Sequence, residues 1–222
     1  MKSHVKSLLL SSLLGLLTAG VLSGSVEAAS TPSGMSGEWG GTSWSSNVPY
    51  NLGAYDYANT PSMSSGYTNN FGLWEGTNDS STLSNWVFVG YSNDFNNAPY
   101  YFWADLRPNS SVYYHSLSNG PTIGTSHAYE VQYLGDDQWG VYIDFNQVGT
   151  STPNPPGSYS AFAGSNDPGY QGTTGSFKDQ TNQSLEYLSN GSWYYWSGGT
   201  LIDQGNFTAQ YTNGYYNEEE SE

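Results

Sequence analysis

The chain has 222 residues, and its formal net charge of −15 comes from nineteen acidic and four basic residues. That balance repels polyanions and leaves no basic patch, which argues against a nucleic acid as partner. The chain has no cysteine, so disulfides and thiolate zinc sites are excluded. His115 and His127 have no metal-ligand spacing around them, and we expect neither a metal nor another cofactor.

Residues 1–28 have the three parts of a secretory signal peptide. Lys2 and Lys6 lie in a charged start, residues 8–22 form an apolar run, and Val26-Glu27-Ala28 fits a small-x-small cleavage site. A transmembrane anchor is the alternative, but the run is short and interrupted by serine and glycine. We expect cleavage after Ala28, secretion to the extracellular space and no membrane association afterwards.

Cleavage would remove Lys2, Lys6 and Glu27, which leaves Arg107 and Lys178 against eighteen acidic residues and a formal charge of −16. Acid unfolds many proteins because their carboxylates are neutralised while their cations continue to repel one another. This chain has too few cations to build that repulsion. We therefore expect it to tolerate acid, with an ordinary acidic secreted domain as the alternative.

After a flexible segment at residues 29–37, short β-rich runs alternate with clusters of glycine, asparagine, serine and proline. This pattern predicts strands at residues 70–74, 86–91, 100–106, 112–116, 127–134, 138–145, 159–163, 183–188, 192–196 and 207–211. The proline-rich residues 150–157 are expected to form a loop, and residues 217–222 a disordered acidic tail. The pattern favours one monomeric domain at residues 38–216.

The clearest pair of strands lies on either side of Gly135-Asp136-Asp137, a sequence with the residues of a hairpin turn. Alternation places three residues on one face of each strand, Tyr129, Val131 and Tyr133 on the first and Val141, Ile143 and Phe145 on the second. No sustained helical period is present. The sequence predicts an all-β, antiparallel, jelly-roll-like β-sandwich of the concanavalin type.

Two kinds of side chain could carry a function. A secreted enzyme with few cations would use paired carboxyl groups, and Asp105 and Glu75 are candidates at strand ends. The structural alternatives are a turn or an ion pair with Arg107 for Asp105, and a position at the sheet rim for Glu75. Glu130 and Asp144 are expected to face solvent.

Aromatic side chains are the second kind. They crowd several short strands, as Tyr100, Tyr101, Trp103, Tyr113, Tyr114, Trp193, Tyr194, Tyr195 and Trp196. Alternate residues of a strand point to opposite faces, so about half of these rings should lie outside the core. Exposed aromatics at such a density favour a binding surface. The alternative is that the rings only pack a sandwich.

Several segments, in order, resemble the neprosin and glutamic peptidase (eqolisin) group of secreted acid proteases. They are residues 73–76 (Leu-Trp-Glu-Gly), 86–91 (Trp-Val-Phe-Val-Gly-Tyr), 101–105 (Tyr-Phe-Trp-Ala-Asp), 127–144, 164–166 (Gly-Ser-Asn) and 175–177 (Gly-Ser-Phe). The resemblance covers about two-thirds of the mature chain. It implies two curved antiparallel sheets with a concave groove.

The family's mechanism needs a Glu–Gln or Glu–Glu pair in that groove, and the two positions fall on Phe88 and Asn166. Neither side chain can take a proton from water, and Asp167 as a substitute restores only one carboxylate. The resemblance implies that Phe88 and Asn166 approach each other across one sheet. Trp86 is then expected to share the face of Phe88, with Tyr101, Trp103 and Asp105 as the next row of the groove.

Two functions remain open. The first is a secreted protein that binds an extended polymer, a polysaccharide or a polypeptide, through aromatics in a groove without catalytic carboxylates. The second is an acid hydrolase, an endopeptidase of the glutamic or aspartic type or a glycan hydrolase, that pairs Asp105 with Glu75 or Asp167.

Overall fold

The computed structural model describes residues 31–45, 52–61, 69–79, 82–93, 98–152, 159–168, 175–178, 186–195, 199–205, 207–212 and 215–220. These residues form strands, turns and bends and contain no helix. The predicted signal peptide, at residues 1–28, lies outside the described residues. Within the described parts of the chain, no helix has the length and apolar character needed to cross a membrane.

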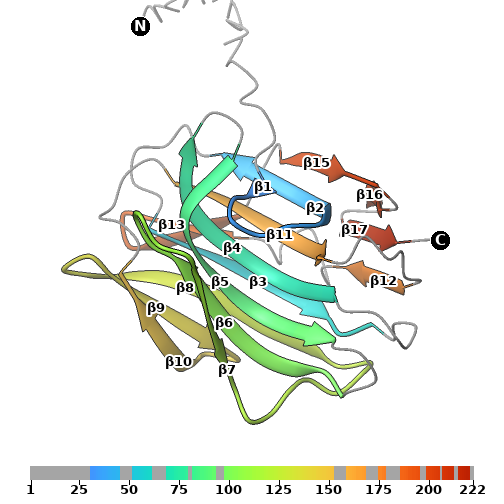
Figure 1. Ribbon diagram of the computed structural model, residues 1–222, viewed down its shortest axis with the longest axis horizontal. Coiled ribbons are helices and arrows are strands. Elements are labelled where there is room, and N and C mark those ends of the chain that lie inside the picture. Colours follow the sequence, from blue (N-terminus) through green and yellow to red (C-terminus); the bar gives the residue numbers. More distant parts are fainter. Residues whose placement is uncertain are drawn as a thin grey trace, which may run out of the picture.

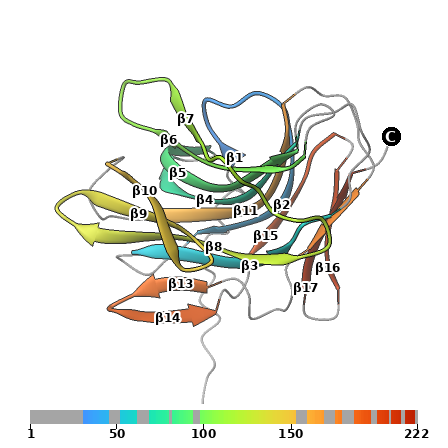
Figure 2. The ribbon, with the colours of Figure 1, turned by 90° about the horizontal axis from the view of Figure 1, so that it is seen from below.

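Two stacked antiparallel sheets form a β-sandwich (Figure 1). The larger sheet has the order β15 (Thr200–Asp203), β2 (Glu38–Ser45), β11 (Tyr159–Asp167), β4 (Asn69–Asp79), β5 (Thr82–Asn93), β6 (Tyr100–Leu106) and β7 (Val112–Ser116). A short strand, β1 (Thr31–Pro32), adds to it in parallel with the start of β5. Figure 2 shows the curvature of this sheet.

The second sheet has the order β10 (Asn146–Ser151), β9 (Gln138–Ile143), β8 (Ser126–Gly135), β3 (Gly53–Asn59), β13 (Glu186–Ser189) and β14 (Ser192–Tyr195). A small third sheet pairs β12 (Gly175–Lys178), β17 (Tyr215–Glu220) and β16 (Phe207–Thr212). The third sheet packs beside β2, where the Phe207 ring covers Gly40.

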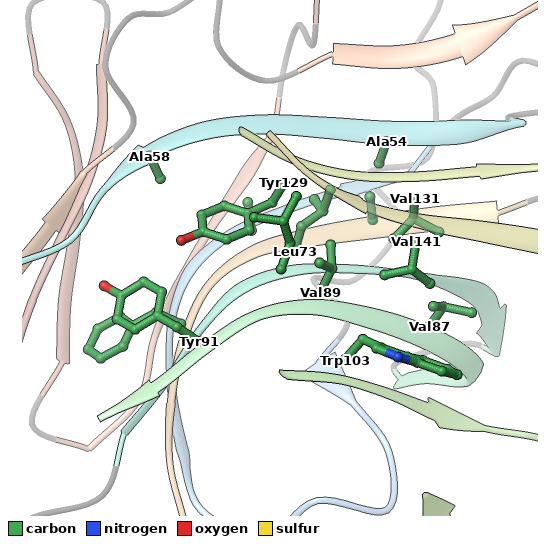
Figure 3. Close-up of a cluster of buried hydrophobic side chains, with 14 of the residues drawn as sticks. Ala54, Ala58, Leu73, Val87, Val89, Tyr91, Trp103, Tyr129, Val131 and Val141 are labelled. Carbon is green, nitrogen blue, oxygen red and sulfur yellow. The ribbon is translucent and has the colours of Figure 1, made fainter. Parts of the chain in front are cut away.

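The main hydrophobic core lies between the two large sheets. Figure 3 shows side chains from both sheets pointing into this space, among them Leu73, Val87 and Val89 from the larger sheet and Tyr129, Val131 and Val141 from the second. All six are fully buried. Each of these strands contributes every second residue to the core, as the period of a strand requires.

A second apolar cluster lies on the opposite face of the larger sheet, which we call the concave face. Its buried members come from β2, β4, β5, β6, β11 and β15 and are Trp39, Trp74, Trp86, Phe88, Phe102, Ala104, Phe162 and Ile202. Aromatic rings therefore fill both faces of this sheet. Five tryptophans are buried in this way, Trp39, Trp74 and Trp86 on the concave face and Trp103 and Trp139 in the main core, and such rings remove much area from water per residue.

The structure confirms the predicted all-β antiparallel sandwich. The bounds of β6 and β7 match the sequence prediction residue for residue, and the hairpin β8–β9 forms through Asp136 and Asp137, both at positive φ. The predicted second strand of that hairpin was two residues too long. Asp144 and Phe145 form a further turn into β10, so Phe145 does not share the core face of Val141 and Ile143.

Two end segments also differ from the sequence prediction. Residues 31–37, expected to be flexible, include β1 and lie over the concave face (Figure 2). Residues 215–220 form β17, paired on both sides, although residues 217–222 were predicted to be a disordered tail. In both places the local composition favours disorder. The segments are nevertheless ordered, because they pair with strands that are distant in the sequence.

Candidate binding site on the concave face

Strand register arranges the concave face in rows across the sheet. A polar row crosses five strands and contains Trp39, Asn166, Asn70, Ser92 and Tyr100. The next row is a glycine row with Gly41, Gly164, Gly72 and Gly90, followed by Phe102 and Ser116. An aromatic row follows with Ser43, Phe162, Trp74, Phe88, Ala104 and Tyr114.

The glycine row makes room for the aromatic row. A Cβ built on Gly90 would lie 2.6 Å from Cζ of Phe88, and one built on Gly72 would lie 2.9 Å from Cε2 of the same ring. The Phe88 ring therefore lies flat over both glycines. Such a close approach to the backbone is possible only where no side chain projects from the sheet.

The N-terminal segment covers part of this face. Trp86 donates a hydrogen bond from Nε1 to the carbonyl oxygen of Ser33 at 2.8 Å. Asn166 donates from Nδ2 to the carbonyl oxygens of Ser36 and Glu38, each at 3.2 Å. These bonds tie residues 33–38 to β5 and β11. The polar row is largely buried as well, since Trp39, Asn166, Asn70 and Ser92 are at most 8% exposed, and Tyr100 at its end is half-buried.

A cavity of about 350 Å³ lies between this segment and the polar and glycine rows. Its sheet-side lining consists of Asn70, Ser92, Tyr100, Phe102, Tyr114, Ser116 and Asn166, and Gly34, Met35, Ser36 and Pro168 close it. The lining combines amides, hydroxyls and rings, and none of these residues carries a charge. This cavity is the candidate functional site.

Hydrogen bonding at the cavity leaves one hydroxyl group unsatisfied. Asn70 donates from Nδ2 to Oδ1 of Asn166 at 3.3 Å, which joins the two amides side by side. The buried hydroxyl of Ser92, next to Asn70 in the polar row, has no hydrogen-bond partner among the described residues. A buried hydroxyl without a partner is unfavourable, and a polar ligand in the cavity could satisfy it.

Two tyrosines and a phenylalanine form one wall of the cavity. The Phe102 ring lies between those of Tyr100 and Tyr114, with ring centroids 6.2 Å and 6.1 Å away. Burial raises the pKa of Tyr114, and the neighbouring Tyr100 raises it further. The Tyr114 hydroxyl therefore keeps its proton at ordinary pH, and it can donate and accept hydrogen bonds beside an apolar ring.

Two residues predicted to line the groove lie on the other face. In the pairing of β5 with β6, Trp103 is opposite Val89 and Tyr101 is opposite Tyr91, and all four belong to the core between the sheets. Asp105 is opposite Val87 and is likewise turned away from the cavity. Phe102 and Ala104 lie beside Phe88 instead of Tyr101 and Trp103. The register between β5 and β6 differs by one residue from the register that the prediction assumed.

Trp86 and Phe88 share the concave face, as predicted, but both are fully buried in the aromatic cluster. Asn166 shares that face as well. It lies in register with Asn70 and Ser92, four residues along β5 from Phe88. The two positions are therefore separated by roughly 13 Å along the strands and roughly 10 Å across them. The predicted approach of Phe88 to Asn166 is wrong.

The candidate carboxylates do not meet in the cavity. Asp105 is 0% exposed, and its Oδ2 accepts hydrogen bonds from Nε of Arg107 at 2.8 Å and from the Ser151 hydroxyl. Glu75 is buried too and is separated from Asp105 by Val87 in the register of the sheet. For Asp105 the structural alternative, an ion pair with Arg107, is confirmed. The backbone of Asp167 pairs with that of Glu38. Its side chain is not among those that the structure describes.

The two histidines have structural partners. His115 stacks on Trp103 with 3.6 Å between ring centroids. His127 lies between Asp144, 2.8 Å from Nδ1, and Thr125, 2.7 Å from Nε2. The Thr125 hydroxyl also lies 2.6 Å from the Thr122 carbonyl oxygen, an acceptor for its proton. This chain of bonds holds a turn together. Among the described residues, no three His, Asp or Glu side chains gather as a metal site.

Sequence reasoning missed the polar row. Asn70 and Ser92 of this row, and Ser116 of the neighbouring glycine row, were not predicted as site residues. Asparagine and serine are abundant throughout the chain and carry no spacing signal. The alternation Asn70-x-Gly72 and Gly90-x-Ser92 was the available signal, since it places small and polar residues on one face of two neighbouring strands.

The fold is shared with glutamic peptidases. A crystal structure of Scytalido-glutamic peptidase with a peptide-based transition-state analogue superposes with a TM-score of 0.61 at 10% sequence identity, over 84% of this chain and 99% of that one. A second structure of that peptidase gives 0.60 at 11% identity over the same shares. SCP-B, a member of the eqolisin family, in complex with the tripeptide Ala-Ile-His gives 0.58 at 10% over 84% and 99%.

No protein-family profile matches the chain, and no curated protein matches it by sequence. At 10–11% identity, the likeness to these peptidases shows a common fold and leaves the activity open.

Proposed function

We propose that the protein is a secreted, acid-tolerant binding protein that holds an uncharged, extended polysaccharide in the cavity of the concave face. The chemistry of the cavity lining carries this proposal. Amide and hydroxyl groups from the polar row and Ser116 lie beside the rings of Tyr100, Phe102 and Tyr114, and none of the described lining residues is charged.

This combination suits a sugar. A pyranose ring has an apolar face that packs on an aromatic ring, and its hydroxyls both donate and accept hydrogen bonds. Asn70 and Ser92 offer such partners at the floor of the cavity, and the Ser92 hydroxyl has none from the described part of the protein. Among the lining residues that the structure describes, a charged ligand would find no counter-charge.

The shape supports an extended ligand. The described lining residues come from five neighbouring strands, β11, β4, β5, β6 and β7, so an extended ligand in the cavity could lie across the strands. Tyr114 of β7 is 57% exposed and stands at the outer side of this path. A polypeptide in the same place is the competing ligand class.

The second function, an acid hydrolase, requires a carboxyl pair in one cleft. No acidic side chain lines the described cavity, and both Asp105 and Glu75 are buried on the other face. The fold shared with glutamic peptidases keeps this alternative worth testing. It would need residues from the parts of the chain outside the described ones.

Retention of the mature protein on insoluble glycans, followed by calorimetric titration with soluble oligosaccharides, tests the proposal. Tyr114→Ala should weaken binding about tenfold or more, which corresponds to about 1.4 kcal/mol. Tyr113→Ala is the matched control, because Tyr113 precedes Tyr114 on β7, is 53% exposed and points to the other face.

Equal binding by both variants would contradict the assignment of the cavity. Binding of unfolded casein but of no glycan, with the same loss in Tyr114→Ala, would place a polypeptide in the cavity and refute the polysaccharide.

A further inference from the structure

A second cavity lies on the opposite side of the molecule, on the outer face of the second sheet. It has a volume of about 340 Å³ and is lined by Tyr55 of β3, Glu130 of β8, Phe145 of the turn between β9 and β10, and Trp193 of β14. Of the four lining residues that the structure describes, three are aromatic and the fourth carries a carboxyl group. None of them contributes to the concave face.

Tyr55 contacts both of the other rings. Phe145 and Tyr55 lie nearly parallel, 14° between planes, with centroids 6.2 Å apart. Trp193 meets Tyr55 at 66°, also with centroids 6.2 Å apart. The Trp193 ring also lies 3.4 Å from a Cβ built on Gly53, so a glycine in β3 gives it space beside Tyr55. The cavity wall therefore combines rings of two different orientations.

Phe145 occupies an unfavourable position for a phenylalanine. Asp144 and Phe145 form the two-residue turn between β9 and β10, with φ of 49° and 63°. Turns of this type favour glycine at the second position, because a bulky side chain there strains the backbone. The ring is also 72% exposed. A strained, exposed aromatic at the rim of a cavity points to a role in binding.

Glu130 places a carboxyl group beside the rings. It is the direct partner of Tyr55 in the pairing of β3 with β8, and residues directly opposite on one face have Cβ atoms about 5 Å apart. The carboxyl is half-buried, and burial raises its pKa. A cation seated next to it would offset that unfavourable burial of negative charge.

We propose that this second cavity binds a small organic cation through a methylated ammonium group, as in choline. Ring faces are negative and attract a cation within about 6 Å of their centroids, and an adjacent carboxylate adds an ion pair. Methylated ammonium suits these walls because its charge is spread over an apolar surface. The formal charge of −15 on the chain also favours a cation over an anion.

The carboxylate distinguishes this site from the concave cavity. A neutral sugar could stack on Tyr55 or Trp193, yet it would gain little from the charge of Glu130. A cationic ligand depends on that charge. The substitution Glu130→Gln keeps the size and the hydrogen-bonding capacity of the side chain and removes only the charge, so it separates the two ligand classes.

Calorimetric titration of the mature protein with choline chloride at pH 7 tests the proposal, with 3,3-dimethylbutan-1-ol as the neutral analogue of the same shape. We expect choline to bind and the neutral alcohol to bind at least about tenfold more weakly. Retention on phosphatidylcholine vesicles, compared with free choline, tells whether the ammonium group arrives on a lipid or on a soluble molecule.

Three variants locate the binding. Glu130→Gln should weaken choline binding about tenfold or more. Phe145→Gly should weaken it similarly while leaving Tm unchanged or higher, because glycine relieves the positive φ and little buried area is lost. Tyr113→Ala, on the other sheet, should bind choline as the wild type does.

The proposal is overturned if neither choline nor the vesicles bind, or if the neutral alcohol binds as tightly as choline. Unchanged choline binding by Glu130→Gln and Phe145→Gly would overturn it as well. Glycan binding at the concave face does not involve these residues, so the two proposals fail independently.

Discussion

At the scale of single residues, one of the two cations outside the predicted signal peptide stabilises a buried carboxylate. Arg107 extends over β6 to reach Asp105, and its guanidinium also lies 5.8 Å from the centroid of the Tyr113 ring. Asp105 has no exposed surface, whereas the Arg107 side chain is 41% exposed. The arginine thus brings a positive charge from the surface to a carboxylate in the core.

Removing that charge should destabilise the protein. Arg107→Ala leaves Asp105 buried with only the Ser151 hydroxyl as a partner, and we expect a loss of about 1–3 kcal/mol in the free energy of unfolding. Urea denaturation at pH 7 measures it, with Arg107→Lys as a control that retains the charge. A denaturation midpoint for Arg107→Ala equal to that of the wild type would show that the ion pair contributes nothing.

Gly90 tests the packing of the concave face. Gly90→Ala would bring a methyl group within 1.9 Å of the Phe71 carbonyl oxygen and 2.6 Å of the Phe88 ring. The strand or the ring must shift, and overpacking of this kind costs about 1–3 kcal/mol. Thermal melts of Gly90→Ala and of the wild type measure this loss, and Gly124→Ala shows for comparison what a positive φ of 85° costs in open space. A Gly90→Ala variant with the Tm of the wild type would contradict the stacking of Phe88 on the glycine row.

At the scale of elements, the segment from β1 to the start of β2 decides how much of the concave face meets solvent. It covers Trp86 and the rings beside it, packs Met35 against them, and supplies Gly34, Met35 and Ser36 to the cavity wall. A mature chain that lacks residues 29–37 should lose roughly 2–4 kcal/mol of stability, from one buried side chain and several hydrogen bonds.

The same truncation should increase binding of a hydrophobic dye, because aromatic rings of the cluster become exposed. Glycan affinity should fall with it, since one wall of the cavity is removed. Trp86→Phe is the comparison that leaves the segment in place, and it removes the hydrogen bond to Ser33 together with part of a fully buried ring. A truncated chain with wild-type Tm and no dye binding would show that the segment is not packed as described.

The sequence predicts strands best where they are aromatic and bounded by clear turns. Tyr100–Leu106 starts after Pro99 and ends before Arg107-Pro108, and its bounds were predicted correctly. Strands such as Glu38–Ser45 and Gly53–Asn59 were not predicted one by one, because glycine and serine in the first, and glycine, alanine, aspartate and asparagine in the second, give little intrinsic preference for a strand. Their conformation depends on pairing with β11 and β8.

Register explains the errors at the candidate site. Alternation alone correctly grouped Trp86 with Phe88, and Tyr101 with Trp103 and Asp105. It could not say that these two groups face opposite sides, because that depends on how the connection between β5 and β6 aligns the strands. The second cavity was equally hidden, since its residues come from four segments between Tyr55 and Trp193 and Phe145 was assigned to a strand.

At the scale of the whole molecule, charge balance governs the response to acid. Burial raises the pKa of Glu130 above its ordinary value, so the ionised form is disfavoured in the folded state. The protonated Glu130 therefore contributes to the free energy of unfolding. This contribution is fully present below the ordinary glutamate pKa and is lost as the pH rises through the raised pKa of the folded protein. Repulsion between cations at low pH is weak. Outside the predicted signal peptide, the positively charged side chains at that pH are only Arg107, Lys178 and the two histidines.

We therefore expect the thermal midpoint at pH 3–4 to equal or exceed that at pH 7. Scanning calorimetry of the mature protein across this range measures it, and Glu130→Gln should reduce the difference between the two ends. A midpoint clearly lower at pH 3 than at pH 7 would contradict the expected acid tolerance.

The central claim is that the concave cavity binds a glycan and does not cleave it. Incubation of the mature protein with each glycan it retains, and with unfolded casein, at pH 3, 5 and 7, followed by mass spectrometry of ligand and products, tests this most directly. The account predicts that bound oligosaccharides are recovered at their original mass and that retention is lost in Tyr114→Ala. Cleavage products that disappear in Tyr114→Ala but persist in Tyr113→Ala would contradict it and establish a hydrolase at the same cavity.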